Sequence, residues 1–326
     1  VWFESRDADL VPSGEALGTA FLIPALHAGR RVRIDQPTDG QWARNVVTVV
    51  ETAAQWWDTP SCAPAAIPNR PQRRAIGTGL LFTGGVDSFF TLLRSGRTID
   101  SLIHVQGFDI PLSDATRLSS AEADARAVAN ALGIECVVVR TTLQAHPAYR
   151  PVSWERTHGG ALIAIAHLLR RSMGRVLISS SAHRSATRPW GSDRRIDPHW
   201  SSTALAVDHF GEDWWRYQKL EQIADHELVR RYLRVCWEHL TAEPNCSTCD
   251  KCVRTMITLS AAGLLERSER FDGRDLVDRI DALPAALGPA NRREYMVMLE
   301  DEPDDSIKRA VADLLARSQA PSPVEE

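Results

Sequence analysis

A short glycine-rich turn, residues 82–88, carries the side chains with the clearest chemistry in this sequence. It reads Phe-Thr-Gly-Gly-Val-Asp-Ser, follows an apolar run and precedes an amphipathic one, which predicts a strand, a turn and a helix start. Such a turn aims backbone N–H groups and the positive end of a helix at one point, which suits a phosphate. The two glycines allow close approach, and the aspartate can hold Mg²⁺. The residues expected at the phosphates are Thr83, Gly84, Gly85, Val86, Asp87 and Ser88.

The two common nucleotide-binding motifs do not fit this turn: there is no G-x-x-x-x-G-K-[ST], and no G-x-G-x-x-G follows the strand. A plain strand–helix connection is the alternative, because glycine and aspartate are common at turns and helix N-termini. The segment resembles the PP-loop of the N-type ATP pyrophosphatases, S-G-G-x-D-S, with Thr83 where serine is usual. This resemblance implies an adenine nucleotide α-hydrolase-like fold and the cleavage of ATP to AMP and pyrophosphate.

Four of the six cysteines form a second cluster, with the spacing C-x9-C-x2-C-x2-C. Tetrahedral zinc accepts this spacing, because short loops supply neighbouring thiolates and a longer loop returns the fourth. Four thiolates close the coordination of the metal, so a structural role is expected; an iron–sulfur cluster and buried unligated cysteines are the alternatives. Lys251 and Arg254 are placed to offset the excess negative charge. The expected ligands are Cys236, Cys246, Cys249 and Cys252.

Together, the two motifs resemble the 7-cyano-7-deazaguanine synthase branch of the PP-loop superfamily, over about residues 76–256. The resemblance implies that Lys219, which opens a helix before the first cysteine, reaches the nucleotide phosphates, although Gln218 stands where the family has threonine. Arg254 matches the arginine that follows the last cysteine of the family. The substrate segment does not match, since residues 188–198 lack the residues that read the deazaguanine base. The resemblance therefore supports the activation chemistry and not the product.

The elements that must position these residues alternate between strand and helix from residue 76 onward. Strands are expected at 79–82, 102–105, 135–139 and 175–179, and helices at 87–94, 119–132 and 158–171. This alternation predicts an α/β fold with a doubly wound, mostly parallel sheet. Ligands on such sheets bind outside the carboxyl ends of the strands, which is where the glycine-rich turn falls.

Three segments are expected along the chain. Residues 1–73 predict a small α/β unit and a proline-rich linker, residues 74–213 the PP-loop ATP-binding domain, and residues 214–326 a helical region with the cysteine cluster. Residues 180–213 show no regular pattern but carry several arginines and tryptophans, which indicates an irregular loop that covers the substrate. The end, residues 320–326, is expected to be a solvated tail.

The resulting hypothesis is an ATP-dependent ligase. A small-molecule carboxylate attacks the α-phosphorus, pyrophosphate leaves, and ammonia or an amine then displaces AMP. Ser88 and Lys219 stabilise the departing pyrophosphate, Asp87 holds Mg²⁺, and adenine lies near Gly107. Because guanidinium groups match carboxylates, a substrate clamp is expected among the arginines of the irregular loop. The candidates are Arg184, Arg188, Arg194 and Arg195, with catalytic roles assigned to Arg188 and Arg194.

Three further residues have two interpretations each. His158, at the start of a predicted helix, is either an acid–base group or a helix cap. Asp193 and Asp197 either orient the amine and the arginines or cap the loop.

Composition limits the partners. The chain has 326 residues, 44% hydrophobic and 25% charged, and a formal net charge of −4, which argues against nucleic acid; nothing points to a membrane. We expect a cytoplasmic enzyme that uses ATP, Mg²⁺ and structural Zn²⁺, and a homo-oligomer is left open. Only Cys62 and Cys136 lie outside the cluster, which disfavours a sulfur-transfer enzyme. An adenylation-dependent epimerase and a non-catalytic nucleotide-binding protein are the remaining alternatives.

Overall fold

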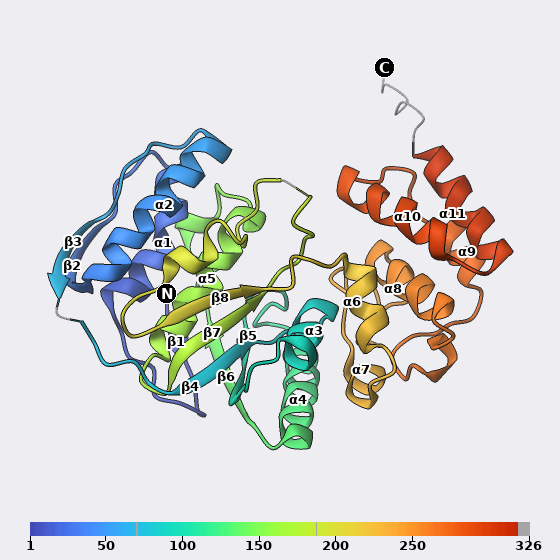
Figure 1. Cartoon of the computed structure of the whole chain (residues 1–326), viewed down its shortest axis with the longest axis horizontal. Coiled ribbons are helices and arrows are strands. Elements are labelled where there is room, and N and C mark those ends of the chain that lie inside the picture. Colours follow the sequence, from blue (N-terminus) through green and yellow to red (C-terminus); the bar gives the residue numbers. More distant parts are fainter. Residues whose placement is uncertain (70, 187, 319–326) are drawn as a thin grey trace. The chain divides into compact units, whose positions relative to one another are not determined.

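A computed structural model gives the fold of the chain (Figure 1), and it describes residues 1–69, 71–186 and 188–318. The chain divides into two compact units. The first unit is made of Val1–Thr83, Thr91–Ser181 and Thr187–Glu212, and the second of Gly84–Phe90, Ala182–Ala186 and Asp213–Glu326. Most of the glycine-rich turn therefore belongs to the same unit as the four cysteines. The segment boundaries expected from the sequence stay predictions, and the expected tail at 320–326 lies outside the described residues.

The apolar strands of the first unit build one mixed sheet. Its strands are β1 (Phe3–Glu4), β4 (Gly77–Leu81), β5 (Ser101–Gln106), β6 (Glu135–Thr141), β7 (Met173–Ser179) and β8 (Ala206–Phe210). In the described part of the chain the order is β1-β6-β5-β4-β7-β8, with β1 antiparallel to β6 and every other pair parallel. The prediction of an α/β protein with a mostly parallel sheet is confirmed.

The strand order reverses at β4. β5 and β6 extend from one side of β4, and β7 and β8 extend from the other. Leu80 and Leu81 point to opposite faces of the sheet, and they are 0% and 5% exposed, so both faces are covered. In parallel sheets the crevice at such a reversal, outside the carboxyl ends of the strands, is where ligands bind. The residues that follow β4 therefore stand at the expected ligand edge.

The first unit contains helices α1 (Gly14–His27), α2 (Gly40–Trp57), α4 (Ala115–Leu132) and α5 (Trp154–Leu168), with 3-10 turns η1 (Pro147–Tyr149) and η2 (Asp197–Trp200). Helix α3 (Val86–Arg94) is divided between the two units. α1 packs against α5, which packs against β7, while α4 packs against β5 and β6; Figure 1 shows α5 and α4 beside opposite faces of the sheet. Leu22 of α1 and Val46 of α2 share one hydrophobic core with Val139 of β6. The first residues of the chain thus complete the core of this unit.

Two strands occur where the sequence indicated irregular chain. β3 (Ala65–Asn69) lies in the expected proline-rich linker and pairs in parallel with β2 (Arg33–Asp39). A proline is tolerated there because a two-stranded sheet consists of edges alone. β8 lies in the segment expected to be an irregular loop, and its polar residues Asp208 and His209 hide the apolar pattern that marked the central strands. Both expectations of irregular structure are wrong at these positions.

The second unit is helical. Its helices are α6 (Arg216–Ile223), α7 (Glu227–Tyr232), α8 (Asp250–Ala261), α9 (Leu276–Asp281), α10 (Pro289–Asp301) and α11 (Asp305–Arg317), with a 3-10 turn η3 (Leu265–Arg267). α8 packs against α6 and α9, and α11 packs against α9 and α10. Among the helices of the described residues, none combines the length and the apolar character needed to cross a bilayer.

Candidate functional site

The glycine-rich turn connects a central strand to a helix. β4 ends at Leu81, and α3 begins at Val86, as the sequence predicted. Gly84 has a φ of +77°, a left-handed conformation that residues with a side chain adopt only with strain. Thr83 is exposed, and the Ser88 hydroxyl donates to the Gly85 carbonyl at 3.0 Å. The N-terminus of α3 therefore follows directly on a turn that glycine makes tight.

Asp87, in the first turn of α3, is held by two cations of α6. Its Oδ1 accepts from Lys219 Nζ at 3.0 Å, and its Oδ2 accepts from Arg216 Nη1 at 2.5 Å. The side chains of Asp87, Lys219 and Arg216 are 15%, 1% and 17% exposed, so water screens their charges weakly. Lys219 Nζ also lies 6.0 Å from the centre of the Phe90 ring. These three charged groups carry one positive charge in excess, which favours an anion beside them.

The protonation state of Asp87 follows from these neighbours. Burial alone would raise the pKa of its carboxyl group, but the charges of Lys219 and Arg216 outweigh burial, so the pKa lies below its usual value. The charge of Lys251 acts in the same direction. Asp87 is therefore ionised at neutral pH and is an oxygen ligand of the kind that Mg²⁺ prefers. A bound Mg²⁺ would share this carboxylate with the two cations or displace them.

The turn is tied to the chain that leads to the first cysteine of the cluster. Arg234 N donates to the Gly84 carbonyl at 2.8 Å. A Cβ placed on Gly84 would lie 3.7 Å from the Tyr232 carbonyl oxygen and 3.8 Å from the Arg234 Cβ, which is ordinary contact. Cys236 follows two residues after Arg234. One backbone hydrogen bond thus joins the turn to the segment that leads into the cysteine cluster.

The four cysteines come together as the spacing predicted. Their sulfur atoms all lie within 4.8 Å of one another, and all four residues are buried. Cys236 Sγ lies 4.0 Å from Cys249 Sγ, and Cys246 Sγ lies 3.9 Å from Cys252 Sγ. These separations exceed the S–S bond of about 2.05 Å. They match the sulfur–sulfur edge of about 3.8 Å in a tetrahedron whose Zn–S bonds are about 2.3 Å. The cluster fits a metal ion such as zinc.

The electrostatics of the thiols favour the binding of a cation. Hydrogen bonding with the Cys252 thiol outweighs burial and lowers the pKa of Cys249 to about 6, while the pKa of Cys252 is raised by the same interaction. One thiolate is therefore stabilised only while its neighbours keep their protons, and a divalent cation removes that conflict. Cys249 N donates to Cys246 Sγ at 3.3 Å, and His239 N donates to Cys236 Sγ at 3.4 Å, as amides around thiolate ligands do.

Asn245 joins the two arms of the cluster, residues 233–236 with the first cysteine and residues 245–252 with the other three. Its Oδ1 accepts from Val235 N at 2.8 Å and from Cys236 N at 3.1 Å, and its Nδ2 donates to the Leu233 carbonyl at 2.9 Å. The residue is 3% exposed and directly precedes Cys246. Sequence reasoning missed this role, because an asparagine after a proline is typical of a turn.

The two cations expected beside the sulfurs, Lys251 and Arg254, interact with carboxylates. Arg254 forms ion pairs with Asp250, at 2.8 Å, and with Glu294 of α10, so carboxylates compensate its charge. Lys251, between two cysteines of the cluster, contributes to the lowered pKa of Asp87. The cysteine cluster therefore carries a cation whose charge acts on the turn.

The arginines expected to clamp a substrate make separate contacts and are not gathered at one point by any of the contacts described. Arg195 donates to Asp193, with Nε 2.8 Å from Oδ1, and Arg184 forms an ion pair of 2.9 Å with another aspartate. Arg188 and Arg194 are exposed in the first unit, and the Arg188 guanidinium lies 3.8 Å from the centre of an indole ring. Carboxylates therefore pair with two of the four, Arg184 and Arg195.

Gly107, expected near adenine, has a structural reason to be glycine. It follows β5 with a φ of +100°, and a Cβ there would lie 2.1 Å from the Thr141 carbonyl oxygen. The backbone of β6 leaves no room for a side chain at this position.

Sequence reasoning also missed Arg216 and a buried polar group. Arg216 precedes Lys219 by three residues in α6, a spacing that places both on one helix face, so a signal was present. In the first unit, His209 Nδ1 and Ser192 Oγ each lie 2.7 Å from Oδ2 of Asp197, a fully buried residue. Asp197, expected as an amine-orienting or capping residue, therefore anchors the returning loop to β8.

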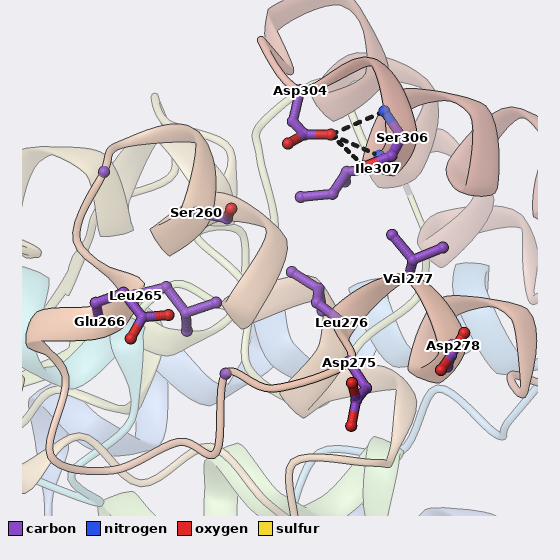
Figure 2. Close-up of a pocket in the computed structure, with 12 residues that line it drawn as sticks. Ser260, Leu265, Glu266, Asp275, Leu276, Val277, Asp278, Asp304, Ser306 and Ile307 are labelled. Carbon is purple, nitrogen blue, oxygen red and sulfur yellow. Dashed lines mark hydrogen bonds between the residues drawn. The ribbon is translucent and has the colours of Figure 1, made fainter.

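A cavity of 480 Å³ opens in the second unit among α8, α9 and the start of α11. Figure 2 shows the carboxylates of Glu266, Asp275, Asp278 and Asp304 around it. Asp304 caps α11 by accepting from Ser306 N at 2.8 Å. Four carboxylates repel a triphosphate, so this cavity does not suit the nucleotide expected at the turn.

Comparison with known proteins adds no relative to these observations. No protein-family model matches the chain, and no curated protein matches it. Function is therefore inferred from the two clusters of the second unit, the ion-paired Asp87 beside the glycine-rich turn and the four buried cysteines.

Proposed function

We propose that this chain is an ATP-dependent ligase of the PP-loop type. It transfers the adenylyl group of ATP to a small-molecule carboxylate with release of pyrophosphate, and ammonia or an amine then displaces AMP. The observation that carries the proposal is the pairing of Asp87 with Lys219 and Arg216 in the turn that follows β4. A strand, a glycine turn, a carboxylate, the buried cation of Lys219 and the partly buried cation of Arg216 suit the binding and cleavage of a triphosphate.

Each charged group has a distinct role in the proposed reaction. Asp87 would hold Mg²⁺ through its carboxylate, and the ion would supply positive charge to offset that of the departing pyrophosphate. Lys219 and Arg216 exchange part of their contact with Asp87 for contact with phosphate oxygens. The N-terminus of α3, which begins at Val86, adds its backbone N–H groups and its dipole. Zinc in the cysteine cluster is structural, because four thiolates leave no open position.

The chemistry of Cys136 counts against the sulfur-transfer alternative. Burial raises the pKa of this thiol to about 11, so it is protonated and weakly nucleophilic at neutral pH. The cysteines of the cluster are committed to one another in a buried site. An acyl transfer to nitrogen therefore fits the side chains better than a transfer of sulfur.

Product analysis tests the proposal. Purified full-length protein is incubated with ATP, Mg²⁺, ammonium and a panel of small carboxylates, and the nucleotides are separated by chromatography. We expect AMP and pyrophosphate in equal amounts. ADP and phosphate as the products would overturn the proposal, and MgATP binding without turnover would indicate a non-catalytic nucleotide-binding protein.

A matched pair of variants locates the activity. Asp87→Asn removes the charge that holds Mg²⁺ and should lower AMP formation by at least about 100-fold. Asp225→Asn is the control, because Asp225 also pairs with two arginines of the second unit, Arg230 at 3.0 Å and Arg267 at 2.8 Å, but is 70% exposed. Equal activity of both variants would remove the glycine-rich turn from the reaction.

A further inference from the structure

Four consecutive residues, 233–236, connect the cysteine cluster to the glycine-rich turn. The Leu233 carbonyl accepts from Asn245, Arg234 N donates to Gly84, and the next two N–H groups donate to Asn245. Cys236 then places its sulfur in the cluster. Every residue of this segment therefore makes a directed contact either with the turn or with the arm that carries Cys246.

The contacts have a mechanical consequence. A metal ion bound by Cys236 and Cys246 would hold residues 233–236 against the segment that carries Asn245 and Cys246. Asn245 in turn fixes the backbone on both sides of Arg234, through Leu233 and Val235. The buried side chain of Asn245 satisfies four backbone groups, of Leu233, Val235, Cys236 and Arg270, and leaving such groups unpaired in the interior is costly. When the arms separate, the donor that holds the Gly84 carbonyl moves with them.

We infer that the four-cysteine cluster is a working part of the nucleotide site: Asn245 is a positioning residue for the glycine-rich turn, and metal binding controls nucleotide affinity through it, beyond its contribution to the stability of the helical unit. The second half of this inference rests on the proposed function.

Hydrogen–deuterium exchange tests the mechanical half without any substrate. Exchange of residues 84–90 is measured in the full-length protein as isolated, after removal of metal with a chelator, and in Asn245→Ala. We expect the amides of the turn to exchange at least about tenfold faster in the last two samples, since local opening governs protection. Unchanged protection of the turn after the metal has left would overturn the inference.

Conservative variants separate positioning from general destabilisation. Asn245→Asp keeps the oxygen that accepts from Val235 and Cys236 but replaces the donor to the Leu233 and Arg270 carbonyls with an acceptor. It should restore part of the protection that Asn245→Ala loses. The control is Asn45→Ala in the first unit, which removes a donor to the Ser201 carbonyl at 3.0 Å and should leave residues 84–90 protected. Equal loosening of the turn by Asn45→Ala would reduce the effect to overall stability.

Calorimetric titration with MgATP tests the second half. Asn245→Ala should raise the dissociation constant by about tenfold, because a loosened turn must be ordered again when the nucleotide binds. Asn45→Ala is the control and should bind MgATP as the parent does. Identical constants for both variants would separate the cysteine cluster from nucleotide binding. If the parent protein binds no MgATP while its turn still loosens on metal removal, the ligase proposal fails and the mechanical coupling stands.

Discussion

Two clusters of ionisable groups in the second unit differ in how their buried charge is compensated. At the turn, the chain supplies its own counter-ions, because Lys219 and Arg216 of α6 surround the carboxylate of Asp87. At the cysteine cluster, four buried sulfur atoms face one another, and the nearby Arg254 is engaged by two carboxylates. The first cluster is complete within the chain, whereas the second requires a cation from outside.

The difference leads us to expect different first effects when each cluster is altered. A closed thiolate cage holds its metal permanently and fixes the surrounding chain. An ion pair with an excess positive charge can exchange partners when a phosphate and Mg²⁺ arrive. We therefore expect substitutions in the cysteine cluster to act on folding first, and substitutions at the turn to act on nucleotide binding first.

Loss of one cysteine ligand should have the largest effect. Cys252 is fully buried, and Cys252→Ser removes a thiolate from the cage. Metal binding should fall sharply, and the free energy of unfolding should decrease by several kcal/mol, roughly the scale expected for a structural metal. Elemental analysis and thermal unfolding measure the two effects. Cys62→Ser, outside the cluster, is the control, and full metal content in Cys252→Ser would show that the metal is held elsewhere.

A double-mutant cycle measures the ion pair at the turn. Asp87→Leu leaves the ammonium of Lys219 almost wholly buried with Arg216 beside it, which should destabilise the protein by about 3–5 kcal/mol. Lys219→Met leaves Asp87 with its second cation and should cost less. The free energy of unfolding lost in the double variant should be smaller, by about 1–3 kcal/mol, than the sum of the losses in the two single variants. Denaturant unfolding gives the values, and strict additivity would mean that the two charges do not interact.

Acid should open the two clusters in a fixed order. The pKa of Asp87 is lowered in the folded protein, so its contribution to stability is complete above its unfolded pKa of about 3.9 and is lost only as pH falls through the lower folded value. The cysteine cluster binds a metal only through thiolates, so protons compete with the metal for its ligands. Because thiolates bind protons far more strongly than carboxylates do, protons should release the metal at a higher pH than that at which Asp87 titrates.

An acid titration with two readouts checks this order. A chromophoric chelator reports metal release, and carboxyl ¹³C resonances of the parent compared with Asp87→Asn report the titration of Asp87. Titration of Asp87 at or above about pH 3.9 would mean that Lys219 and Arg216 do not stabilise its charge in solution.

How much of this could be predicted from the sequence depends on the distance between partners along the chain. The turn and three of the cysteines lie in short segments, so their spacing alone indicated strand, helix start and ligands. Arg216 and Asp87 are separated by 129 positions, and no local pattern shows that α6 returns to α3. From the sequence, Asn245 is typical of a turn, because most of its hydrogen-bond partners lie about ten positions earlier and are brought to it only by folding. At β8 the polar residues of an edge strand hid the period on which strand prediction depends.

The smallest effect on stability is expected at the turn itself, where two glycines allow a matched comparison. Gly84 and Gly133 have φ values of +77° and +66°, so alanine at either position should cost about 1–2 kcal/mol through backbone strain. At Gly84 the added Cβ would meet its neighbours at 3.7 Å or more, and nothing lies within 4 Å of it at Gly133, so sterics do not separate the two. What separates them is position, because Gly84 belongs to the proposed phosphate turn while Gly133 ends α4. Thermal unfolding should therefore place the two variants together, and calorimetric titration should show weakened MgATP binding in Gly84→Ala alone. Equal MgATP affinity in both variants would mean that the turn does not hold the nucleotide.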